Sequence, residues 1–406
     1  MKILHVIGSM DPVTGGPCQG IRNLNNVLKQ MNIEREVACL DNPQSSYLGN
    51  DKFPIHALGP SKTKWQYSPK LIPWLNKNIE RFDVVIINGI WLHHVYAAIK
   101  ALKKFKKRKI IFQNESGTFP KAFIMLHGML DPYFQNDRTR RIKAIRNWIY
   151  WYLIEGYNIR RVNALLFACQ TEMELAKHSF SYYKPRKEIN VGYGVEEPPV
   201  FTETMKWSLS EKCPGLNDSP YLLFLGRVHP KKGVDLLIKA YSELLEINEN
   251  RSQIELPKLV IAGPGMDTDY GNYLMKLISR DPKIKDSVFF PGMLTGEGKW
   301  AALYGSEAFV LPSHQENFGI SVVEALACKK PVLISDKINI WKEIIEGGGG
   351  VIKDDTLEGT IELIKSWVNL NMEEKLKMAK NARNVYENNF GVLAAAIRFK
   401  NAIVNN

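Results

Sequence analysis

The sequence predicts an α/β protein of two doubly wound, Rossmann-like domains, and three observations lead to this prediction. The chain has 406 residues, more than one hydrophobic core usually organises. Short apolar runs alternate with segments of helical periodicity in both halves, as in parallel α/β folds. Residues 195–220 interrupt this alternation with prolines and polar residues. We therefore expect domains over 1–195 and 196–385, and a C-terminal helix over 386–406 that crosses back to the first domain.

The expected strands follow one another along the chain, with helix candidates such as 233–247 and 272–280 between them. The run GGGG at 347–350 indicates a turn before the last strand. Ligands of such folds bind at the carboxyl ends of the strands, so a ligand is expected in the cleft between the domains. The strand candidates are KILHVI (2–7), EVACL (36–40), DVVIIN (83–88), AFIML (122–126), ALLFA (164–168), YLLFLG (221–226), KLVIAG (258–263), SVFFPG (287–292), AFVLPS (308–313), PVLIS (331–335) and VIKDD (351–355).

The composition is that of a globular protein. Hydrophobic residues make up 45% of the chain, and no apolar run approaches the roughly 20 residues that span a bilayer. The first residues, MKILHVIGSMDP, indicate a strand and loop and not a signal peptide. The cysteines are scattered and form no CxxC pair, which favours reduced, packing thiols in a cytoplasmic protein. They are Cys18, Cys39, Cys169, Cys213 and Cys328.

The net charge of +12 is accompanied by two basic segments, KALKKFKKRK (100–109) and residues 138–161. The second also contains Trp148, Tyr150, Trp151 and Tyr152. Basic and aromatic residues together suit an anionic membrane, so we expect peripheral contact with the inner face of the plasma membrane. A solvated basic helix face over a buried aromatic face explains the pattern equally well and stays open. No DNA- or RNA-binding motif accompanies the charge, so nucleic acid is not an expected partner.

Two glutamates, Glu316 and Glu324, lie in a segment that reads strand, tight loop and helix. The apolar run FVLPS is followed by polar HQENFG and then by ISVVEALAC, which has helical spacing. Glu316 is thus expected in the loop, and Glu324 about one turn inside the helix. The helix N-terminus suits a phosphate, which would repel both carboxylates. The carboxylates are therefore better suited to accept hydrogen bonds from neutral hydroxyls beside that phosphate. A sugar nucleotide has this arrangement of hydroxyls and phosphates. The alternative is that one glutamate caps the helix and the other pairs with a nearby lysine.

Two cations follow the strand YLLFL, in the segment GRVHPKKGVDLLIKAY (226–241). Arg227 leaves the carboxyl end of the strand, and Lys232 precedes the glycine that opens the next helix. Together they can neutralise a pyrophosphate without a metal, most strongly when a nucleoside diphosphate departs and its β-phosphate gains charge. Ordinary loop cations are the alternative, which the two glutamates after a later strand of the same domain disfavour.

These segments, with LVIAGPG (259–265) and VFFPGML (288–294), resemble in order and spacing the motifs of retaining glycosyltransferases of family four, which have the GT-B fold. The pair Gly15–Gly16, DVVIINGIW (83–91) and HGMLDP (127–132) agree as well, so the resemblance covers nearly the whole chain. It implies a retaining hexosyltransferase of bacterial polysaccharide synthesis. The implied donor is a UDP-hexose such as UDP-glucose, the acceptor is a glycan or lipid-linked glycan, and neither a cofactor nor a metal is expected.

The resemblance also implies residue roles. Glu316 would hold hydroxyls of the donor sugar, and Glu324 the ribose hydroxyls. His127 would lie near the transferred carbon, with a loop-holding histidine as its alternative. Gly16 would let the backbone approach the phosphate. The implied catalytic residues are His127, Arg227, Lys232 and Glu316; the pyrophosphate would be held by Arg227, Lys232 and the amides of Phe318, Gly319 and Ile320, and the base by Gly292 and Met293.

Two segments depart from the family pattern. Tyr193, in NVGYGVEEP, stands where the family commonly has Asn, and 109–123 is longer than usual, which suggests an insertion.

The DxD motif Asp267–Asp269 follows GPGM on an expected surface loop, and no metal is expected there. A dinucleotide-dependent oxidoreductase is disfavoured because neither glycine-rich segment is GxGxxG. A nucleotide-sugar epimerase or other GT-B enzyme, and a non-catalytic sugar-nucleotide sensor, remain the alternatives.

Overall fold

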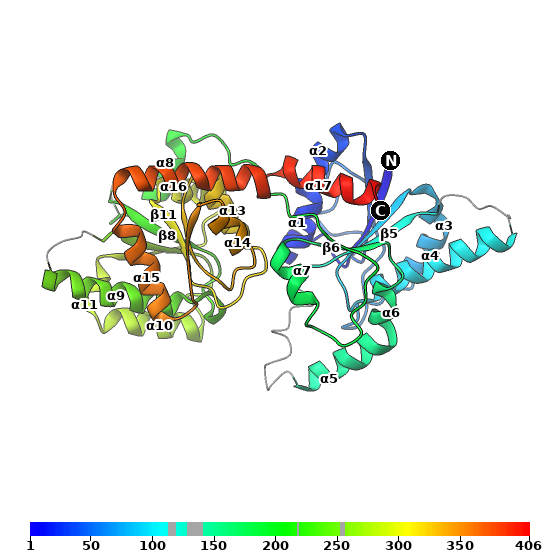
Figure 1. Ribbon diagram of the computed structural model, residues 1–406, viewed down its shortest axis with the longest axis horizontal. Helices are drawn as coiled ribbons and strands as arrows, with labels where there is room; N and C mark the ends of the chain where they lie inside the picture. The colour runs from blue at the N-terminus through cyan, green and yellow to red at the C-terminus, as the bar shows by residue number, and fades with distance from the viewer. Residues whose placement is uncertain (113–118, 128–140, 217–218, 252–255) are drawn as a thin grey trace. The chain divides into compact units, whose positions relative to one another are not determined.

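The chain forms two compact units, each built around one parallel sheet (Figure 1). The structure is a computed structural model that describes residues 1–112, 119–127, 141–216, 219–251 and 256–406. The first unit comprises Met1–Gly194 and Val392–Asn406, and the second comprises Val195–Gly391. The chain thus enters the first unit again at Val392 and not at the expected residue 386. The residues before Val392 still pack in the second unit, where the Tyr386 hydroxyl donates to the Val195 carbonyl at 2.9 Å.

The sheet of the first unit has the strand order β3-β2-β1-β4-β5-β6-β7 and is parallel throughout. In its centre Leu4 pairs with Glu36 on one side and with Val85 on the other. The bounds are β1 Lys2–Val6, β2 Glu34–Cys39, β3 Ile55–Ala57, β4 Val84–Asn88, β5 Lys121–Met125, β6 Ala164–Phe167 and β7 Glu188–Asn190.

The helices of the first unit include the returning C-terminal helix α17. It packs against α2, and the Lys121 ammonium donates to its last carbonyls, at 2.8 Å for Val404. The bounds are η1 Pro12–Thr14, α1 Gly16–Asn23, α2 Asn25–Gln30, α3 Leu71–Asn78, η2 Ile79–Arg81, α4 His93–Phe112, α5 Arg141–Tyr150, the π-helical turn η5 Trp151–Glu155, α6 Gly156–Ile159, α7 Gln170–Ala176 and α17 Val392–Val404.

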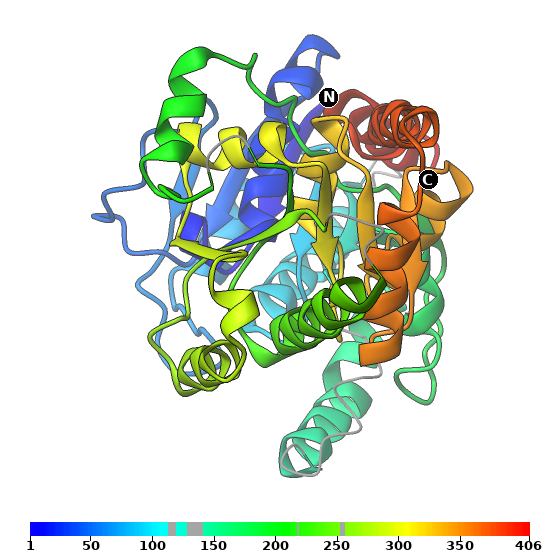
Figure 2. The same ribbon diagram turned by 90° about the vertical axis from the view of Figure 1, so that its left-hand side faces the viewer.

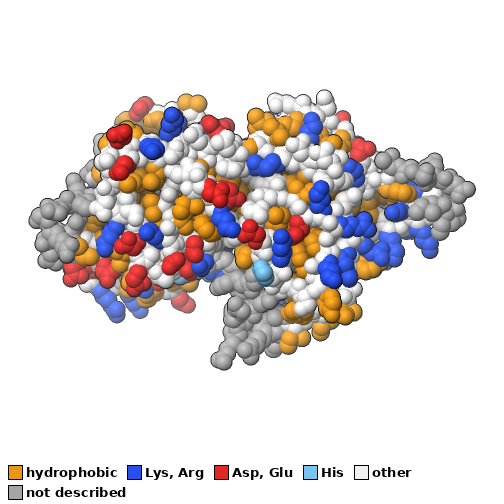
Figure 3. Space-filling model, viewed as in Figure 1, with side chains coloured by type: hydrophobic (Ala, Val, Ile, Leu, Met, Phe, Trp, Pro, Cys, Tyr) orange, Lys and Arg blue, Asp and Glu red, His pale blue; other side chains and the backbone are white. Residues whose placement is uncertain are grey.

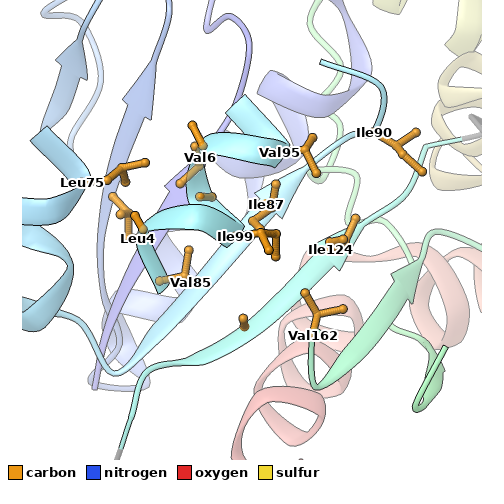
Figure 4. Packing of buried hydrophobic residues seen from close by; sticks show 14 of the residues in the cluster. Leu4, Val6, Leu75, Val85, Ile87, Ile90, Val95, Ile99, Ile124 and Val162 are labelled. Carbon is orange, nitrogen blue, oxygen red and sulfur yellow. The ribbon is translucent and has the colours of Figure 1, made fainter. Parts of the chain in front are cut away.

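The core of the first unit lies between its central strands and the helices that cover them. Strands buried on both faces are continuously apolar, which explains runs such as VVIIN in β4. Each fully buried Leu, Ile or Val side chain stabilises the fold by about 1.5–3 kcal/mol. Figure 4 shows the packing of Leu4, Val6, Leu75, Val85, Ile87, Ile90, Val95, Ile99, Ile124 and Val162.

The sheet of the second unit has the strand order β10-β9-β8-β11-β12-β13 and is also parallel. Both sheets thus contain the 3-2-1-4-5-6 order of doubly wound folds. The bounds are β8 Tyr221–Leu225, β9 Lys258–Ala262, β10 Val288–Gly292, β11 Ala308–Leu311, β12 Val332–Ser335 and β13 Gly350–Lys353.

Helices cover both faces of the second sheet (Figure 2). Helices α9, α10 and α15 lie on one face, where α9 contacts both others, and α12, α13 and α16 lie on the other. The bounds are α8 Glu203–Ser210, η6 Pro230–Lys232, α9 Val234–Arg251, α10 Asp269–Ser279, α11 Pro282–Lys285, α12 Gly296–Gly305, α13 Ile320–Ala327, α14 Trp341–Glu346, α15 Leu357–Val368, α16 Met372–Val385 and the π-helical turn η7 Tyr386–Phe390.

The expected fold class is confirmed, and every expected strand is present. The turn expected at 347–350 covers residues 347–349 between α14 and β13, with Gly348 at φ +67°, and Gly350 is the first residue of β13. Two strands were not expected from the sequence, β3 and β7, which have three residues each, IHA and EIN. Both are edge strands with half-buried residues, so neither contains the apolar run that marks a central strand.

The cysteines are free and buried, as expected for packing thiols. Burial raises the pKa of Cys213 to about 11 and that of Cys328 to about 12. At neutral pH these thiols are therefore protonated and fill space in the core.

Candidate functional site

The candidate site lies in the second unit, at the carboxyl ends of the neighbouring strands β8 and β11. The chain leaves β8 toward β9 on one side and leaves β11 toward β12 on the other. At such a switch point the two outgoing loops diverge and form a crevice for ligands. The β8 loop (226–233) contains Arg227 and Lys232, and the β11 loop (312–319) contains Glu316, so the structure brings three of the predicted residues to one switch point.

Backbone contacts hold the two loops together. Gly233 ends the β8 loop in the left-handed region, with φ +66°, and a Cβ there would lie 2.1 Å from the Pro312 carbonyl oxygen. The Lys231 carbonyl accepts from the Ser313 hydroxyl at 2.9 Å and from the His314 N–H at 2.8 Å. Only a glycine at 233 allows this approach, which is the physical reason for the lysine–glycine step in KKGVD.

The Lys232 ammonium forms an ion pair with a carboxylate oxygen of Glu316. The two side chains come from different loops, and each is largely buried, with 16% and 24% of its surface exposed. The backbone of Glu316 is itself anchored, because its N–H donates to the Lys337 carbonyl at 3.0 Å and its carbonyl accepts from the Asn339 N–H at 3.0 Å. Lys232 and Glu316 therefore reach one common point above the sheet.

The β8 loop is electropositive. Burial lowers the pKa of His229, and the nearby charges of Arg227, Lys231 and Lys232 lower it further. His229 is thus neutral at neutral pH, and its Nδ1 accepts from the Lys231 N–H at 3.1 Å. Arg227 is exposed and forms no hydrogen bond or ion pair within the described residues. A guanidinium in this state is available for an anion.

The N-terminus of α13 adjoins these charges. Gly319 precedes the helix at φ +72°, and no side chain caps α13. Phe318 is buried and packs edge-on against Phe390 at 5.6 Å. As predicted, Glu316 lies in the loop, and Glu324 lies about one turn inside the helix that begins at Ile320. A helix start without a side-chain cap is suited to a negatively charged group.

Glu324 has a lysine partner, as the alternative reading of the two glutamates expects, although the helix cap of that alternative is absent from α13. Its carboxylate pairs with the Lys299 ammonium of α12 at 2.8 Å, and Lys299 also lies 4.0 Å from the centre of the Trp300 ring. Both charged side chains are mostly buried. Lys299 precedes Glu324 by 25 positions on another helix, so no spacing in the sequence indicates the pair.

Gly292 and Met293 lie at the end of β10, two strands away from β8. The Gly292 carbonyl accepts from the Gly263 N–H at 2.8 Å. Gly263 in turn lies against the β8 loop, since a Cβ at this position would be 1.8 Å from the Gly226 carbonyl oxygen. Met293 is 62% exposed. The structure thus connects Gly292 to the β8 loop through Gly263, whereas Met293 forms no hydrogen bond or ion pair with the charged residues among the described residues.

The remaining predicted residues, His127 and Gly16, belong to the first unit. His127 follows β5, and burial lowers its pKa to about 4. Its Nε2 has no hydrogen-bond partner among the described residues. It lines a cavity of about 40 Å³ together with His5, Asn88 and Tyr193. A cavity of this size has room for about one water molecule.

Tyr193, which departs from the family pattern, contacts Gly16 directly. Its hydroxyl donates to the Gly16 carbonyl at the start of α1. Its ring packs on Gly20, where a Cβ would lie 2.5 Å from a ring carbon. Burial raises the pKa of the phenol, so the hydroxyl keeps its proton. Tyr193 thus holds the glycine-rich loop and α1 in place.

The residue between the two aspartates of the DxD motif caps a helix. The Thr268 hydroxyl caps α10 by accepting from the Gly271 N–H at 3.2 Å, and Asp267 and Asp269 are exposed on either side of it. Within the described part of the chain, no cluster of three potential metal ligands is present. Of the expected insertion at 109–123 and the segment HGMLDP, residues 113–118 and 128–132 lie outside the described residues.

The chain is similar in sequence to known glycosyltransferases over part of its length. Residues 206–385, less than half of the chain, match the family model described as "Glycosyl transferases group 1". The chain is 34% identical over 138 residues to a D-inositol 3-phosphate glycosyltransferase of Frankia alni, and this alignment covers 33% of each chain. It is 30% identical over 139 residues to an alpha-galactosylglucosyldiacylglycerol synthase of Streptococcus pneumoniae, again over 33% of each. The alignments thus span about a third of these curated relatives.

A solved structure resembles the chain over its whole length. The HepE protein (Alr3699) of Anabaena, in complex with UDP, gives a TM-score of 0.71 at 16% identity, with 100% of both chains covered. This likeness shows the fold alone, which is the GT-B fold of two Rossmann-like units with parallel sheets.

Proposed function

We propose that this chain is a retaining glycosyltransferase that transfers a hexose from a UDP-hexose to a glycan or lipid-linked glycan acceptor in polysaccharide synthesis. The observation that supports it best is the ion pair between Lys232 and Glu316, because it joins an anion-binding loop to a hydroxyl-binding carboxylate at the switch point of the sheet. The match of residues 206–385 to a glycosyltransferase family model supports the same reaction class. The UDP in the HepE structure supports the choice of nucleotide.

The β8 loop and the N-terminus of α13 would bind the pyrophosphate. Arg227 and Lys232 supply positive charge, and the backbone amides of Phe318, Gly319 and Ile320 supply donors at a helix start without a side-chain cap. When Lys232 binds the pyrophosphate, its ion pair with Glu316 breaks. The Glu316 carboxylate can then accept hydrogen bonds from the donor sugar. The ion pair thus holds both side chains in place before the donor binds, which lowers the entropic cost of binding.

The nucleoside would lie along α13 and the end of β10. Glu324 would accept hydrogen bonds from the ribose hydroxyls, and its pair with Lys299 orients the carboxylate for them. Gly292 and Met293 would contact the base. In the first unit, Gly16 at the start of α1 would allow the backbone to approach the phosphate.

The reaction would proceed by same-face substitution. The bond from the anomeric carbon to the β-phosphate oxygen breaks and forms a short-lived oxocarbenium-like ion pair. The acceptor hydroxyl oxygen then bonds to that carbon on the same face, and its proton passes to the departing phosphate. Arg227 and Lys232 stabilise the charge that develops on the phosphate. His127, with a pKa of about 4, is neutral and would contribute a hydrogen bond and not a positive charge.

No metal is required in this scheme, because two cations serve the phosphate. EDTA is expected to leave the transfer rate unchanged, and complete loss of activity in EDTA would contradict this part of the proposal.

The acceptor and the peripheral contact with an anionic membrane are parts of the proposal as well, since a lipid-linked acceptor lies at a membrane surface.

The test combines binding and product analysis. A thermal-shift screen of nucleoside diphosphates and their sugars is expected to give the largest stabilisation with UDP and a UDP-hexose. NMR of the product is expected to show the same anomeric configuration as the donor, and an axial-to-equatorial change would refute retention. Incubation with the donor alone separates the alternatives: a transferase hydrolyses the donor slowly, an epimerase converts it to its isomer, and a sensor leaves it intact.

A further inference from the structure

The continuous helix α5–η5–α6 has one side that is anchored in the first unit. The Tyr150 hydroxyl accepts from the Trp65 indole N–H at 2.9 Å, and the Trp151 indole donates to the Ser181 carbonyl at 3.0 Å. Glu155 is fully buried and accepts from the Trp91 N–H at 3.0 Å. These contacts fix the rotation of the helix about its axis and thereby decide which residues face outward.

The opposite side of the helix exposes a stripe of large apolar residues. They recur at the spacing i, i+3, i+4, i+7 and i+8, which places them on one face of a helix. Between 38% and 69% of the surface of each is exposed. The aromatic residues of this helix therefore lie on both sides of it: Trp151 is buried, whereas Trp148 and Tyr152 are exposed. The apolar stripe consists of Ile145, Trp148, Ile149, Tyr152 and Leu153.

The apolar stripe leads into a basic groove. Tyr157 follows Leu153 by four positions, and the Arg161 guanidinium lies 3.6 Å from the centre of the Tyr157 ring. Arg161 in turn lines a groove of about 660 Å³ whose floor includes Leu102, Phe105 and Phe119. No acidic side chain lines this groove within the described residues. The cationic groove, as we call it, is rimmed by Lys103, Lys106, Lys107, Lys121, Arg161 and Arg186.

Both features lie on one face of the first unit. Figure 3 shows Lys and Arg side chains gathered over α4 and hydrophobic side chains gathered beside them, over α5. The excess of positive charge belongs to this unit as a whole, because the second unit contains more acidic than basic residues. The excess of positive charge and the apolar stripe thus occur together on the first unit.

We propose that the apolar stripe and the cationic groove form a docking face for an anionic lipid bilayer. The apolar side chains would enter the boundary between headgroups and acyl chains, and the cations of the groove would contact lipid phosphates. Tyrosine and tryptophan suit this boundary because each combines an apolar ring with a polar atom. The helix would lie on the membrane and not cross it, since within the described residues no helix is long and apolar enough to span a bilayer.

A bilayer fits this face better than a second copy of the chain does. Two copies that met through the face would bring two cationic grooves together, and like charges in contact disfavour association. Within the first unit, the groove and the proposed site residue His127 lie at opposite ends of β5. The groove is lined by Lys121 at the first residue of β5, whereas His127 follows the last residue of that strand. The proposed function explains why a membrane is present, and the inference rests on it in that respect alone.

The test measures co-sedimentation of the full chain with vesicles, without donor or acceptor. Vesicles of equal parts of phosphatidylcholine and phosphatidylglycerol are expected to bind the protein, and pure phosphatidylcholine vesicles to bind it weakly. High salt is expected to reduce the binding. Equal binding to both kinds of vesicle, or no binding to either, would overturn the proposal.

Paired variants test the apolar stripe. The double variant Ile149→Gln, Leu153→Gln is expected to bind anionic vesicles about tenfold more weakly. The matched control is Leu393→Gln, Ile397→Gln, which changes the same residue types, also exposed and four positions apart on α17 of the same unit. It is expected to bind like the unchanged protein. Equal binding of both double variants would contradict the assignment.

A second pair of variants tests the cationic groove. The triple variant Lys103→Gln, Lys106→Gln, Lys107→Gln is expected to bind about tenfold more weakly and with less dependence on salt. The control removes the same charge from exposed lysines elsewhere in the unit, Lys52→Gln, Lys62→Gln, Lys64→Gln. If both triple variants lose binding equally, net charge and not the groove attracts the membrane.

Two further measurements separate this inference from its rivals. Light scattering is expected to show a monomer, and self-association that the stripe variant abolishes would indicate that a second copy covers the face. UDP binding, followed by thermal shift without vesicles, is expected to be unchanged in the stripe variant. A protein that binds vesicles and not UDP would refute the proposed function alone, and one that binds UDP and not vesicles would refute the docking face alone.

Discussion

Lys299 and Glu324 form an ion pair at 2.8 Å that joins α12 to α13 at the proposed nucleotide site. The ion pair holds the Glu324 carboxylate against α12, so this carboxylate neither caps α13 nor extends freely into solvent. The spacing of Lys299 and Glu324 in the sequence does not indicate that they pair. In the structure the pair fixes the position of the carboxylate, so we expect the function of Glu324 to depend on Lys299.

A double-mutant cycle tests this dependence. We expect Lys299→Met and Glu324→Gln each to weaken UDP binding several-fold, because each breaks the same pair. The double variant should lose less than the sum of the two, with a coupling energy of about 1 kcal/mol. Titration calorimetry with UDP measures the cycle, and strictly additive losses would show that the pair does not orient Glu324.

The two glutamates should have different kinetic effects. Glu316→Ala removes contacts to the donor sugar and is expected to lower kcat on the order of 100-fold with modest change in UDP affinity. Glu324→Ala removes contacts to the ribose and is expected to weaken UDP binding about tenfold. Steady-state kinetics and UDP titration check both. Near-normal turnover of Glu316→Ala together with complete loss in Glu324→Ala would reverse the assignment.

Gly233 is expected to be indispensable for the contact between the two loops. Gly233→Ala places a Cβ at a positive φ and 2.1 Å from the Pro312 carbonyl oxygen, so the loops must separate and the Lys232–Glu316 pair must break. We expect a loss of stability of about 3 kcal/mol or more, with loss of UDP binding. The control Gly296→Ala has φ +52° and an open Cβ position, and should cost about 1 kcal/mol. Denaturant unfolding measures both, and equal losses would exclude the steric explanation.

Glu155 should make the first unit less stable as the pH rises. Burial raises the pKa of its carboxyl from 4.5 to about 7 in the folded state. Between these values the folded protein keeps a proton that the unfolded chain loses, so stability falls from pH 4.5 to pH 7 and is level above it. The difference amounts to about 3 kcal/mol, at about 1.4 kcal/mol per pKa unit.

Substitution isolates this effect from other titrating groups. His94 and His127 have a pKa of about 4 and act in the opposite direction over much of the same range. Glu155→Gln should therefore gain stability relative to the unchanged protein between pH 5 and pH 8, measured by denaturant unfolding at each pH. The control Glu34→Gln removes an exposed carboxylate and should show no such trend. A constant difference across this range for Glu155→Gln would contradict the raised pKa.

The sequence predicted the positions of the candidate residues in loops and helices as far as local pattern reaches. Glu316 and Glu324 were placed correctly in loop and helix because strand, glycine turn and helical spacing are contiguous along the chain. Lys232 was placed before its helix for the same reason. The contact between Lys232 and Glu316, 84 positions apart, is not encoded in any spacing and arises because β8 and β11 are neighbours in the sheet.

The aromatic helix shows the same limit. The sequence places Trp148, Trp151 and Tyr152 on one helix, but their composition does not say which of them faces the core. The contacts of Tyr150, Trp151 and Glu155 with the rest of the first unit decide this, and they leave Trp148 and Tyr152 outside.

By itself, the sequence determined the two-unit α/β architecture and the order of its strands along the chain, because burial of periodic apolar runs is a local property of the chain. It also determined which loops contain the charged residues. Only the tertiary structure decided which charges meet, which carboxylates are held, and which apolar residues remain exposed. These depend on the order of strands within the sheet and on the rotation of each helix, which are set by contacts between residues far apart in the sequence.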